Sequence, residues 1–259
     1  MSEVQYGSIH SGALGKQMPF SIYLPAGYGG NVRFPALYFL HGRSGNEGIM
    51  AELGIQSVAD GLIASKQISP MVIVCPRMDN SRGLNTSEAP RRAAANGMTI
   101  DMGRYEDYFI KEVIPYIDRH FKTIPNREYR YVGGASAGGF AATHYGLQYP
   151  ELFSRIGGHM PAIEAELDAS DVPYYGDEAG FHASNPLAFD RYEELHQQQR
   201  WYLDAGEQDE GGFNKTAKSL SDKLRAHGVS VEHHIFPGHH NLQYIKDNIR
   251  KYLIFYGAE

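Results

Sequence analysis

The sequence has little cysteine, no long apolar run and no signal region, which are the features that disulfide-rich, membrane-spanning and secreted proteins require. It contains one cysteine, Cys75, in 259 residues, which excludes an internal disulfide framework and is typical of a reducing compartment. No apolar run approaches the roughly 18 residues of a membrane span. The opening residues, MSEVQYGSIH, include neither a basic nor an apolar signal region. We therefore expect a cytoplasmic protein without a membrane segment.

Charge of either sign is also not gathered into blocks. The formal net charge is −6, and the 24 Lys and Arg residues are interspersed with the 30 Asp and Glu residues. A nucleic-acid-binding surface needs clustered basic residues, so we expect no nucleic-acid partner. Apolar residues make up 42% of the chain, which is enough to build a full core in a globular protein.

Short apolar runs bounded by turn residues alternate with helical patterns. The first 30 residues predict two antiparallel strands that turn at Ser11–Gly12. Further strands are predicted at 34–42, 70–76, 128–134, 153–160, 200–206 and 229–236, and helices at about 48–66, 104–121, 140–149, 211–227 and 240–256. Residues 77–100 have no clear period and predict a long loop, and the polar stretch 161–199 predicts a small insertion.

This alternation predicts an α/β fold with a mostly parallel central sheet, antiparallel N-terminal strands and helices on both faces. Proline at position 115 should bend or interrupt the helix over 104–121. No repeat, low-complexity tract or linker divides the chain. We therefore predict a single domain over residues 1–259.

The stretch YRYVGGASAGGFAATHY, residues 129–145, carries the strongest chemical signal. Its centre, Gly134-Ala135-Ser136-Ala137-Gly138, matches the pattern G-x-S-x-G between a predicted strand and a predicted helix. Small neighbours allow the strand and helix to approach closely, and the helix N-terminus offers free N–H groups to a developing oxyanion. Ser136 is thus a candidate nucleophile; the alternative is a glycine-rich turn without chemistry.

A nucleophilic serine needs a base, which in this type of sheet follows later in the chain. His239 and His240 come after the predicted strand 229–236 and the breaker Pro237-Gly238, so both can reach across the carboxyl edge of the sheet. His233 and His234 lie inside the strand and should point to opposite faces. The residues alone leave His239 and His240 as equal alternatives.

The base in turn needs an acid that orients it. Asp204 falls within the predicted strand 200–206, whereas Glu207, Asp209 and Glu210 fall in the loop beyond it. A loop position at the sheet edge is the useful one, and we favour Asp209.

The run HHIFPGHH, residues 233–240, contains four histidines and raises the alternative of a metal site. Adjacent strand residues cannot both face one ion, and no cysteine or carboxylate lies at ligand spacing around them. We predict no metal site.

Taken together, these segments resemble the esterase D-like (putative esterase) family of α/β-hydrolases, which includes feruloyl and acetylxylan esterases. The matching segments are FPALYFLHGRSGNE, YEDYFIKEVIPYIDRHF, YRYVGGASAGGFAATHYGLQYPELFSRIGG, LDAGEQD and FPGHHNLQY. The resemblance implies an α/β-hydrolase fold and a serine carboxylester hydrolase that acts through an acyl-enzyme. It implies a small-molecule ester as partner, no cofactor, and leaves a homo-oligomer open.

The resemblance also implies a role for individual residues. It places the nucleophile at Ser136, the acid at Asp209 in Gly206-Glu207-Gln208-Asp209, and the base at His239 after Gly238. Because many relatives have an acidic or aromatic residue where His240-Asn241 stands here, His240 stays as the alternative base.

By the same resemblance, the oxyanion hole would combine the N–H groups of Ala137 and Arg43, with Gly42 shaping the turn. The side chain of Arg43 would add positive charge near the substrate. For Arg43 and the other arginines of the loops, we expect plain solvation of the side chain; these are Arg77, Arg82, Arg91 and Arg92.

The substrate is not fixed by these patterns. A small acyl, aryl or sugar ester is expected; a siderophore ester, an acyltransferase with the same triad and a non-catalytic binding protein are the alternatives. The loop HGRSGNE does not resemble that of the glutathione-thioester branch. Aromatic residues in and after the insertion either stack on a substrate ring or form the insertion's own core; they are Tyr174, Tyr175, Phe181 and Trp201.

Overall fold

Eight strands form one mixed sheet at the centre of the molecule. They are β1 (Glu3–Ser11), β2 (Lys16–Leu24), β3 (Ala36–Leu40), β4 (Val72–Pro76), β7 (Arg130–Ala135), β8 (Arg155–His159), β9 (Arg200–Gln208) and β10 (Ser230–His239). The computed structural model describes residues 1–86, 91–95, 98–195 and 198–258, and residues 91–95 through their backbone. The strand order is β1-β2-β4-β3-β7-β8-β9-β10.

The first two strands are antiparallel, and β2 is antiparallel to β4, whereas every later pair is parallel. Each residue of β3, β4 and β7 is buried, as expected for central strands covered on both faces. The predicted mixed α/β sheet is therefore confirmed.

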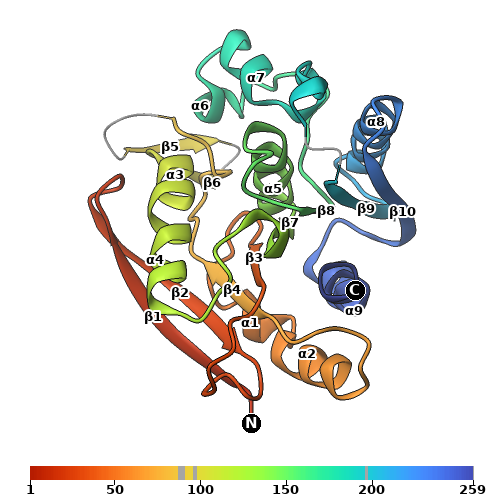
Figure 1. Ribbon diagram of the computed structural model, residues 1–259. Helices are drawn as coiled ribbons and strands as arrows, with labels where there is room; N and C mark the ends of the chain where they lie inside the picture. The colour runs from red at the N-terminus through yellow and green to blue at the C-terminus, as the bar shows by residue number, and fades with distance from the viewer. Residues whose placement is uncertain (87–90, 96–97, 196–197, 259) are drawn as a thin grey trace.

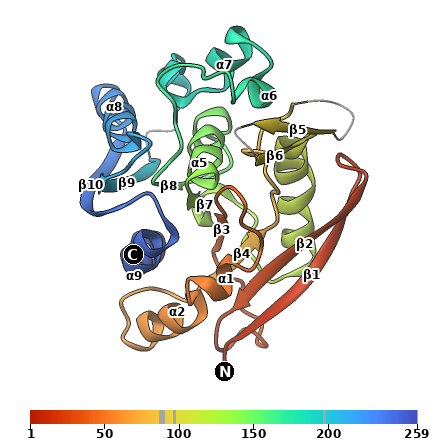
Figure 2. The same ribbon diagram turned by 180° about the vertical axis from the view of Figure 1, so that it is seen from behind.

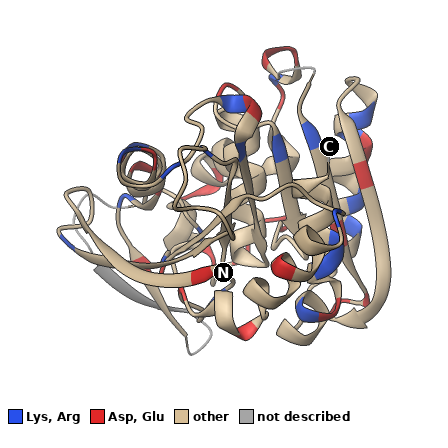
Figure 3. Ribbon diagram, turned by 60° about the horizontal axis from the view of Figure 1, so that its bottom comes forward, with Lys and Arg blue, Asp and Glu red and all other residues tan. Residues whose placement is uncertain are grey.

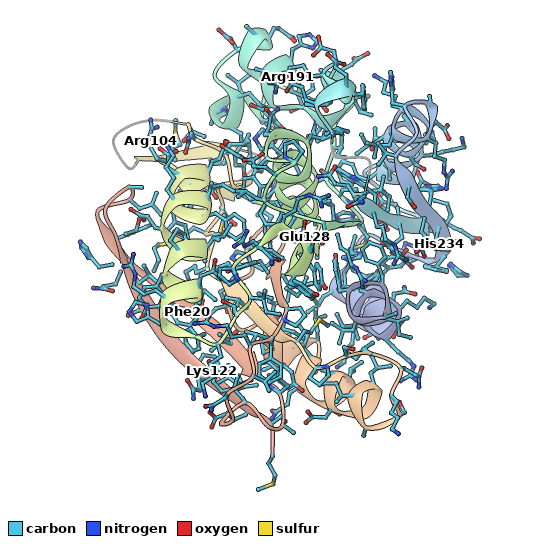
Figure 4. The ribbon with its side chains drawn as sticks, viewed as in Figure 1. Phe20, Arg104, Lys122, Glu128, Arg191 and His234 are labelled. Carbon is cyan, nitrogen blue, oxygen red and sulfur yellow. The ribbon has the colours of Figure 1, made fainter. Side chains whose placement is uncertain are left out.

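Helices cover both faces of this sheet (Figure 1). One face packs against α1 (Ile49–Glu52), α2 (Ile55–Ala64) and α9 (Leu242–Gly257). The other packs against α3 (Tyr105–Asp107), the π-helix η1 (Tyr108–Val113), α4 (Ile114–His120), α5 (Ala137–Gln148) and α8 (Phe213–Ala226). On this second face, Phe20 from β2 packs edge-on against Tyr116 of α4, with ring centroids 5.9 Å apart (Figure 4).

Two predicted helices are interrupted. The helix expected over 48–66 is divided at Gly54, whose φ of 62° is in the left-handed region that glycine adopts readily. The helix expected over 104–121 contains the π-helical segment η1 just before Pro115, which has no N–H to continue the regular pattern. Pro115 therefore interrupts the helix as predicted.

The long loop predicted over 77–100 is wrong in its second half. Here β5 (Arg91–Ala95) pairs antiparallel with β6 (Met98–Met102) in a separate hairpin. This hairpin lies beside the short helix α6 (Val172–Tyr175) in both Figure 1 and Figure 2. The first strand, Arg-Arg-Ala-Ala-Ala, has no alternation of apolar and polar residues, whereas the second, Met-Thr-Ile-Asp-Met, does alternate and was missed because it has no recognisable partner strand in the sequence.

The insertion over 161–199 is built from short helices; residues 196–197 lie outside the described part. It comprises α6, α7 (Glu178–Ser184) and the 3₁₀ turns η3 (Pro186–Ala188) and η4 (Tyr192–Glu194). All four aromatics that were candidates for substrate stacking are buried in the apolar core, namely Tyr174, Tyr175, Phe181 and Trp201. They pack into the main core on one face of the sheet, so the insertion does not have the separate core of its own that was the second alternative.

Arg82 is the main correction among the arginines, because its side chain is buried rather than solvated. Its guanidinium forms a bidentate ion pair with Glu164 and donates to Asp171 Oδ1 (3.3 Å) and to the hydroxyl of Tyr175 (3.0 Å). It therefore fastens the insertion to the loop after β4. Elsewhere, Arg77 pairs with Glu47 (2.7 Å), and the side chains of Arg91 and Arg92 lie outside the described residues.

Charged residues of both signs are interspersed over the ribbon in Figure 3. In the described part of the chain, no helix combines the length and the apolar character that a bilayer crossing requires.

The packing of α9 on the sheet depends on two glycines in neighbouring strands. A Cβ atom added at Gly157 would lie 1.7 Å from the hydroxyl of Tyr256, and one at Gly133 would lie 1.8 Å from it. We predict that Gly157→Ala lowers the free energy of unfolding by about 1–3 kcal/mol through overpacking. Urea denaturation measures this change.

The matched control is Gly61→Ala in the interior of α2, where an added Cβ meets nothing within 4 Å. This variant should gain stability, by up to about 1 kcal/mol, because alanine favours a helix over glycine. Equal effects of the two substitutions would contradict the packing described here.

Candidate active site

Ser136 is the single residue between the end of β7 and the start of α5. Its backbone has φ 54° and ψ −113°, a strained conformation for a residue with a side chain. Three backbone hydrogen bonds hold it: its N–H donates to His159 O (2.9 Å), and its carbonyl accepts from the N–H groups of Phe140 (2.9 Å) and Ala162 (3.0 Å). The turn is therefore fixed from both sides.

The glycines that flank Ser136 are needed where the backbone passes close to the end of β3. A Cβ atom at Gly134 would lie 2.6 Å from the carbonyl oxygen of Leu40, and one at Gly138 would lie 2.3 Å from the same oxygen. Real Cβ atoms do not approach so closely. The steric reason proposed for the small residues of G-x-S-x-G is therefore confirmed.

His240 lies within hydrogen-bond distance of both Ser136 and Asp209. The distance from Ser136 Oγ to His240 Nε2 is 2.8 Å, and that from His240 Nδ1 to Asp209 Oδ2 is also 2.8 Å. Because a carboxylate only accepts, Nδ1–H must donate to Asp209, and in the neutral ring Nε2 then accepts from the serine hydroxyl. This is the geometry of a nucleophile, a base and an orienting acid.

Asp209 occupies the position predicted for the acid, and its side chain is fully buried. Its second oxygen, Oδ1, accepts from the N–H groups of Gly211 (3.0 Å) and Phe213 (3.3 Å) at the start of α8. Each oxygen thus has its own donors, which fixes the carboxylate against His240.

His239 does not contact Ser136, so its predicted place beside the serine is wrong. Strand β10 continues to His239, which pairs with Gln208 after a register shift that follows Phe236. The His239 side chain is 59% exposed and its Nδ1 lies 2.7 Å from Glu210 Oε1. Because successive residues point to opposite sides, the next residue, His240, faces the serine.

One feature of the sequence could have favoured His240 over His239 as the base. Asn241 caps α9, since its Oδ1 accepts the N–H of Tyr244 (3.0 Å). An N-cap asparagine at 241 indicates that the helix begins at Leu242, so His240 is the last residue of the connecting loop.

Glu210 lies in the loop where the sequence placed it, but its contact with the segment of His240 was not predicted. Its carboxylate accepts the backbone N–H of His240 (3.0 Å). This bond, together with one from Glu210's own backbone N–H to the carboxylate and the contact with His239, lowers the pKa of Glu210 to about 2. A charged Glu210 therefore holds the loop that carries His240.

The two predicted oxyanion donors both line the cavity at Ser136. Ala137 is the first residue of α5, where N–H groups have no acceptor within the helix. The carbonyl of Gly42 accepts from His41 Nδ1 (2.8 Å) and from the N–H of Gly45 (3.0 Å). In a trans peptide group the N–H points in the opposite direction from the carbonyl. The N–H of Arg43 belongs to the same peptide group as the carbonyl of Gly42, so this N–H is directed away from His41.

The cavity at Ser136 has a volume of about 590 Å³. Most of its wall is apolar and is formed by Ile49, Met98, Ala135, Ala137, Met160, Ala162, Phe213, Leu242 and Ile245. Arg43 stands at its edge, 3.7 Å from Asp171 and with its side chain 31% exposed. The side chain of Arg43 is thus neither fully solvated nor buried.

A second cavity of about 480 Å³ shares Arg43 and Phe213 with the first. The ring centroid of Phe213 lies 5.1 Å from that of His240. A larger share of its wall than of the first cavity's is polar; besides Ile163 and Ala165, its lining includes Arg82, Glu164, Ser170, Asp171, Lys215 and Thr216.

Metal binding has no candidate site within the part of the chain that the structure describes, where no three His, Cys, Asp or Glu side chains are grouped suitably. In β10, His234 packs against Tyr202 on the α9 side (4.9 Å between centroids; Figure 4). His233 instead lies near the charged groups of α8. The two side chains therefore point to opposite faces, as predicted.

A mixed sheet of this order, with a serine on the strand–helix turn in contact with a histidine–aspartate pair, defines a serine hydrolase of the α/β-hydrolase fold. The chain belongs to the Esterase family: the family model described as "Putative esterase" matches residues 11–256.

Known relatives agree with this assignment. The chain is 30% identical over 162 residues to an endo-1,4-beta-xylanase/feruloyl esterase of Xylanibacter ruminicola, a match that covers 60% of this chain and 21% of the relative. It is 25% identical over 273 residues to Esterase Rv1288 of Mycobacterium tuberculosis, covering 91% of this chain and 55% of that protein. The chain thus spans about a fifth of the first relative and about half of the second.

Among solved structures, a ferulic acid esterase superposes with a TM-score of 0.81 and 23% identity, covering 99% of this chain and 98% of the other. This likeness establishes the fold.

The buried ring of His41 generates a prediction on pH. Its Nδ1–H donates to Gly42, its Nε2 accepts the N–H of Met78 (2.9 Å), and burial lowers its pKa. Below about pH 6.5, His41 therefore binds a proton in the unfolded chain but not in the folded chain. The free energy of unfolding decreases as the pH falls through this range. We predict that His41→Gln reduces the loss of Tm between pH 7.5 and pH 5.5, because glutamine can donate and accept without titrating.

Thermal unfolding at both pH values measures this, with His10→Gln at an exposed position as the control for removing one histidine. A loss of Tm in His41→Gln as large as in the wild type would show that His41 does not contribute to the acid sensitivity.

Proposed function

We propose that the protein is a serine carboxylester hydrolase in which Ser136 is the nucleophile, His240 the base and Asp209 the acid. The observation that carries this proposal is the continuous relay of hydrogen bonds from Ser136 through His240 to Asp209, at 2.8 Å for each step. A binding protein that only retained the fold would have no need of such a relay.

The geometry supports the following sequence of steps. Ser136 Oγ attacks the ester carbonyl as His240 Nε2 takes the hydroxyl proton, and Asp209 stabilises the imidazolium. The N–H groups of Ala137 and Arg43 bind the oxyanion of the tetrahedral intermediate. When the intermediate collapses, the alcohol leaves with the proton from His240, and water then releases the acid by the reverse use of the same groups.

The first cavity favours an apolar acyl group. Its volume of about 590 Å³ far exceeds what an acetyl group fills, and its wall is mostly apolar. Both the Xylanibacter relative and the superposed structure have names that include feruloyl or ferulic acid esterase. We infer that the acyl half is an aryl or hydroxycinnamoyl group.

The second cavity favours a polar alcohol. The leaving oxygen must lie near His240 Nε2 to receive its proton, so the alcohol half lies on the His240 side of the site. Phe213 beside His240 also borders the second cavity. There, side chains such as Asp171, Lys215 and Thr216 can bond to hydroxyl groups. A sugar ester fits both cavities.

The two adjacent histidines provide the test of this function. We predict that His240→Ala lowers kcat/KM for methyl ferulate by at least about 10³-fold, because the serine loses its base. The control is His239→Ala, which removes the same type of side chain one residue away and should keep kcat/KM within about threefold of wild type. Steady-state kinetics with purified proteins measure both values.

The opposite ranking of the two variants would restore His239 as the base. Comparable activity of both variants and the wild type would contradict the proposed relay altogether.

A further inference from the structure

The carboxylate of Asp204 is fully buried, and none of the catalytic steps above uses it. It accepts three hydrogen bonds: Oδ1 from His159 Nδ1 (2.8 Å), and Oδ2 from the hydroxyls of Tyr244 (2.7 Å) and Tyr252 (2.7 Å). A buried carboxylate is costly unless donors surround it in this way. Asp204, in the middle of β9, therefore joins the end of β8 to the last helix, α9.

One arm of this network leads to Ser136. The backbone carbonyl of Asp204 accepts the N–H of Met160 (2.8 Å), and the carbonyl of His159 accepts the N–H of Ser136 (2.9 Å). The ring of His159 stacks on Tyr252, with centroids 3.6 Å apart, while its Nδ1 bonds to Asp204. Asp204 thus fixes His159, and His159 holds the strained turn at Ser136.

The other arm leads to His240. Tyr244 is in the first turn of α9, and its N–H donates to Asn241, the residue directly after His240. Its ring also packs against the loop, since a Cβ atom at Gly238 would lie 2.8 Å from Tyr244 Cδ2. Fixing the Tyr244 hydroxyl on Asp204 therefore fixes the segment that carries His240.

We propose that Tyr244 is a positioning residue, which through Asp204 holds His240 at hydrogen-bond distance from Ser136. The inference rests on the proposed function, in which His240 is the base. Tyr244 does not line the cavity at Ser136, so its effect is indirect. A shift of about 1 Å in a reacting group can reduce a rate about 100-fold, and thus loss of this anchor should affect the chemical step.

Tyr252 provides a matched control. Its hydroxyl donates to the same oxygen atom of Asp204 at the same distance of 2.7 Å, and it comes from the same helix. It lies eight residues further along α9 and has no bond to Asn241. Both Tyr→Phe substitutions therefore remove one equivalent hydrogen bond and keep the aromatic ring, including the stack of residue 252 on His159. Only Tyr244→Phe releases the start of the helix.

The experiment compares Tyr244→Phe with Tyr252→Phe in urea denaturation and in kinetics with one ester, well below either Tm. We expect both variants to lose similar stability. In addition, Tyr244→Phe should lower kcat by about tenfold or more with KM within about twofold, while Tyr252→Phe keeps kcat within about twofold. Equal kcat in the two variants, whether reduced or unchanged, would overturn the proposal.

If Tyr244→Phe does not fold, the link from Tyr244 to the His240 segment is tested at Asn241, whose Oδ1 accepts the Tyr244 N–H. Asn241→Ala should lower kcat, and Asn241→Asp should restore it because aspartate also caps a helix; equal kcat in these two variants would overturn the proposal. Failure of the proposed function is recognised separately, by His240→Ala retaining wild-type activity.

Discussion

The chain must turn from β7 into α5 within one residue, and the rest of the site depends on that constraint. A non-glycine backbone at φ 54° and ψ −113° costs on the order of 1–3 kcal/mol and persists only when its surroundings enforce it. Here the carbonyl of His159 and the N–H of Ala162 enforce it from β8 and from the segment that follows. Gly134 and Gly138 allow the turn to lie against the end of β3. As a result, the Ser136 hydroxyl is set in place before any substrate arrives.

The remaining groups reach Ser136 because parallel strands end at one edge of the sheet. Asp209 follows β9 and His240 follows β10, while Arg43 follows β3. The insertion borders the second cavity at this edge through Ser170 and its neighbours, and the buried guanidinium of Arg82 holds it there through Glu164 and Asp171. Burial raises the pKa of Asp171, an effect that Arg82 opposes. A buried ion pair of this kind fixes an arrangement more than it adds stability.

The periodicity of the sequence predicted most of the sheet, the flanking helices, Ser136 and Asp209, because each depends on a local pattern or on a loop that directly follows a strand. His240 was not separated from His239, since that choice depends on a register shift that extends β10 by three residues beyond its apolar run. Burial of Arg82 depends on partners 82 and 89 positions away. In the β5–β6 hairpin, β5 has no alternating pattern, so its pairing with β6 was not predicted. These features arise from contacts between distant segments.

Reaction with a fluorophosphonate, followed by peptide mapping, tests the nucleophile most directly, because this reagent modifies a serine only when a neighbouring base activates it. We expect one adduct per chain, located on Ser136, and no adduct in Ser136→Ala. A stoichiometric adduct on another residue, or undiminished labelling of Ser136→Ala, would contradict the assignment of Ser136 as the nucleophile.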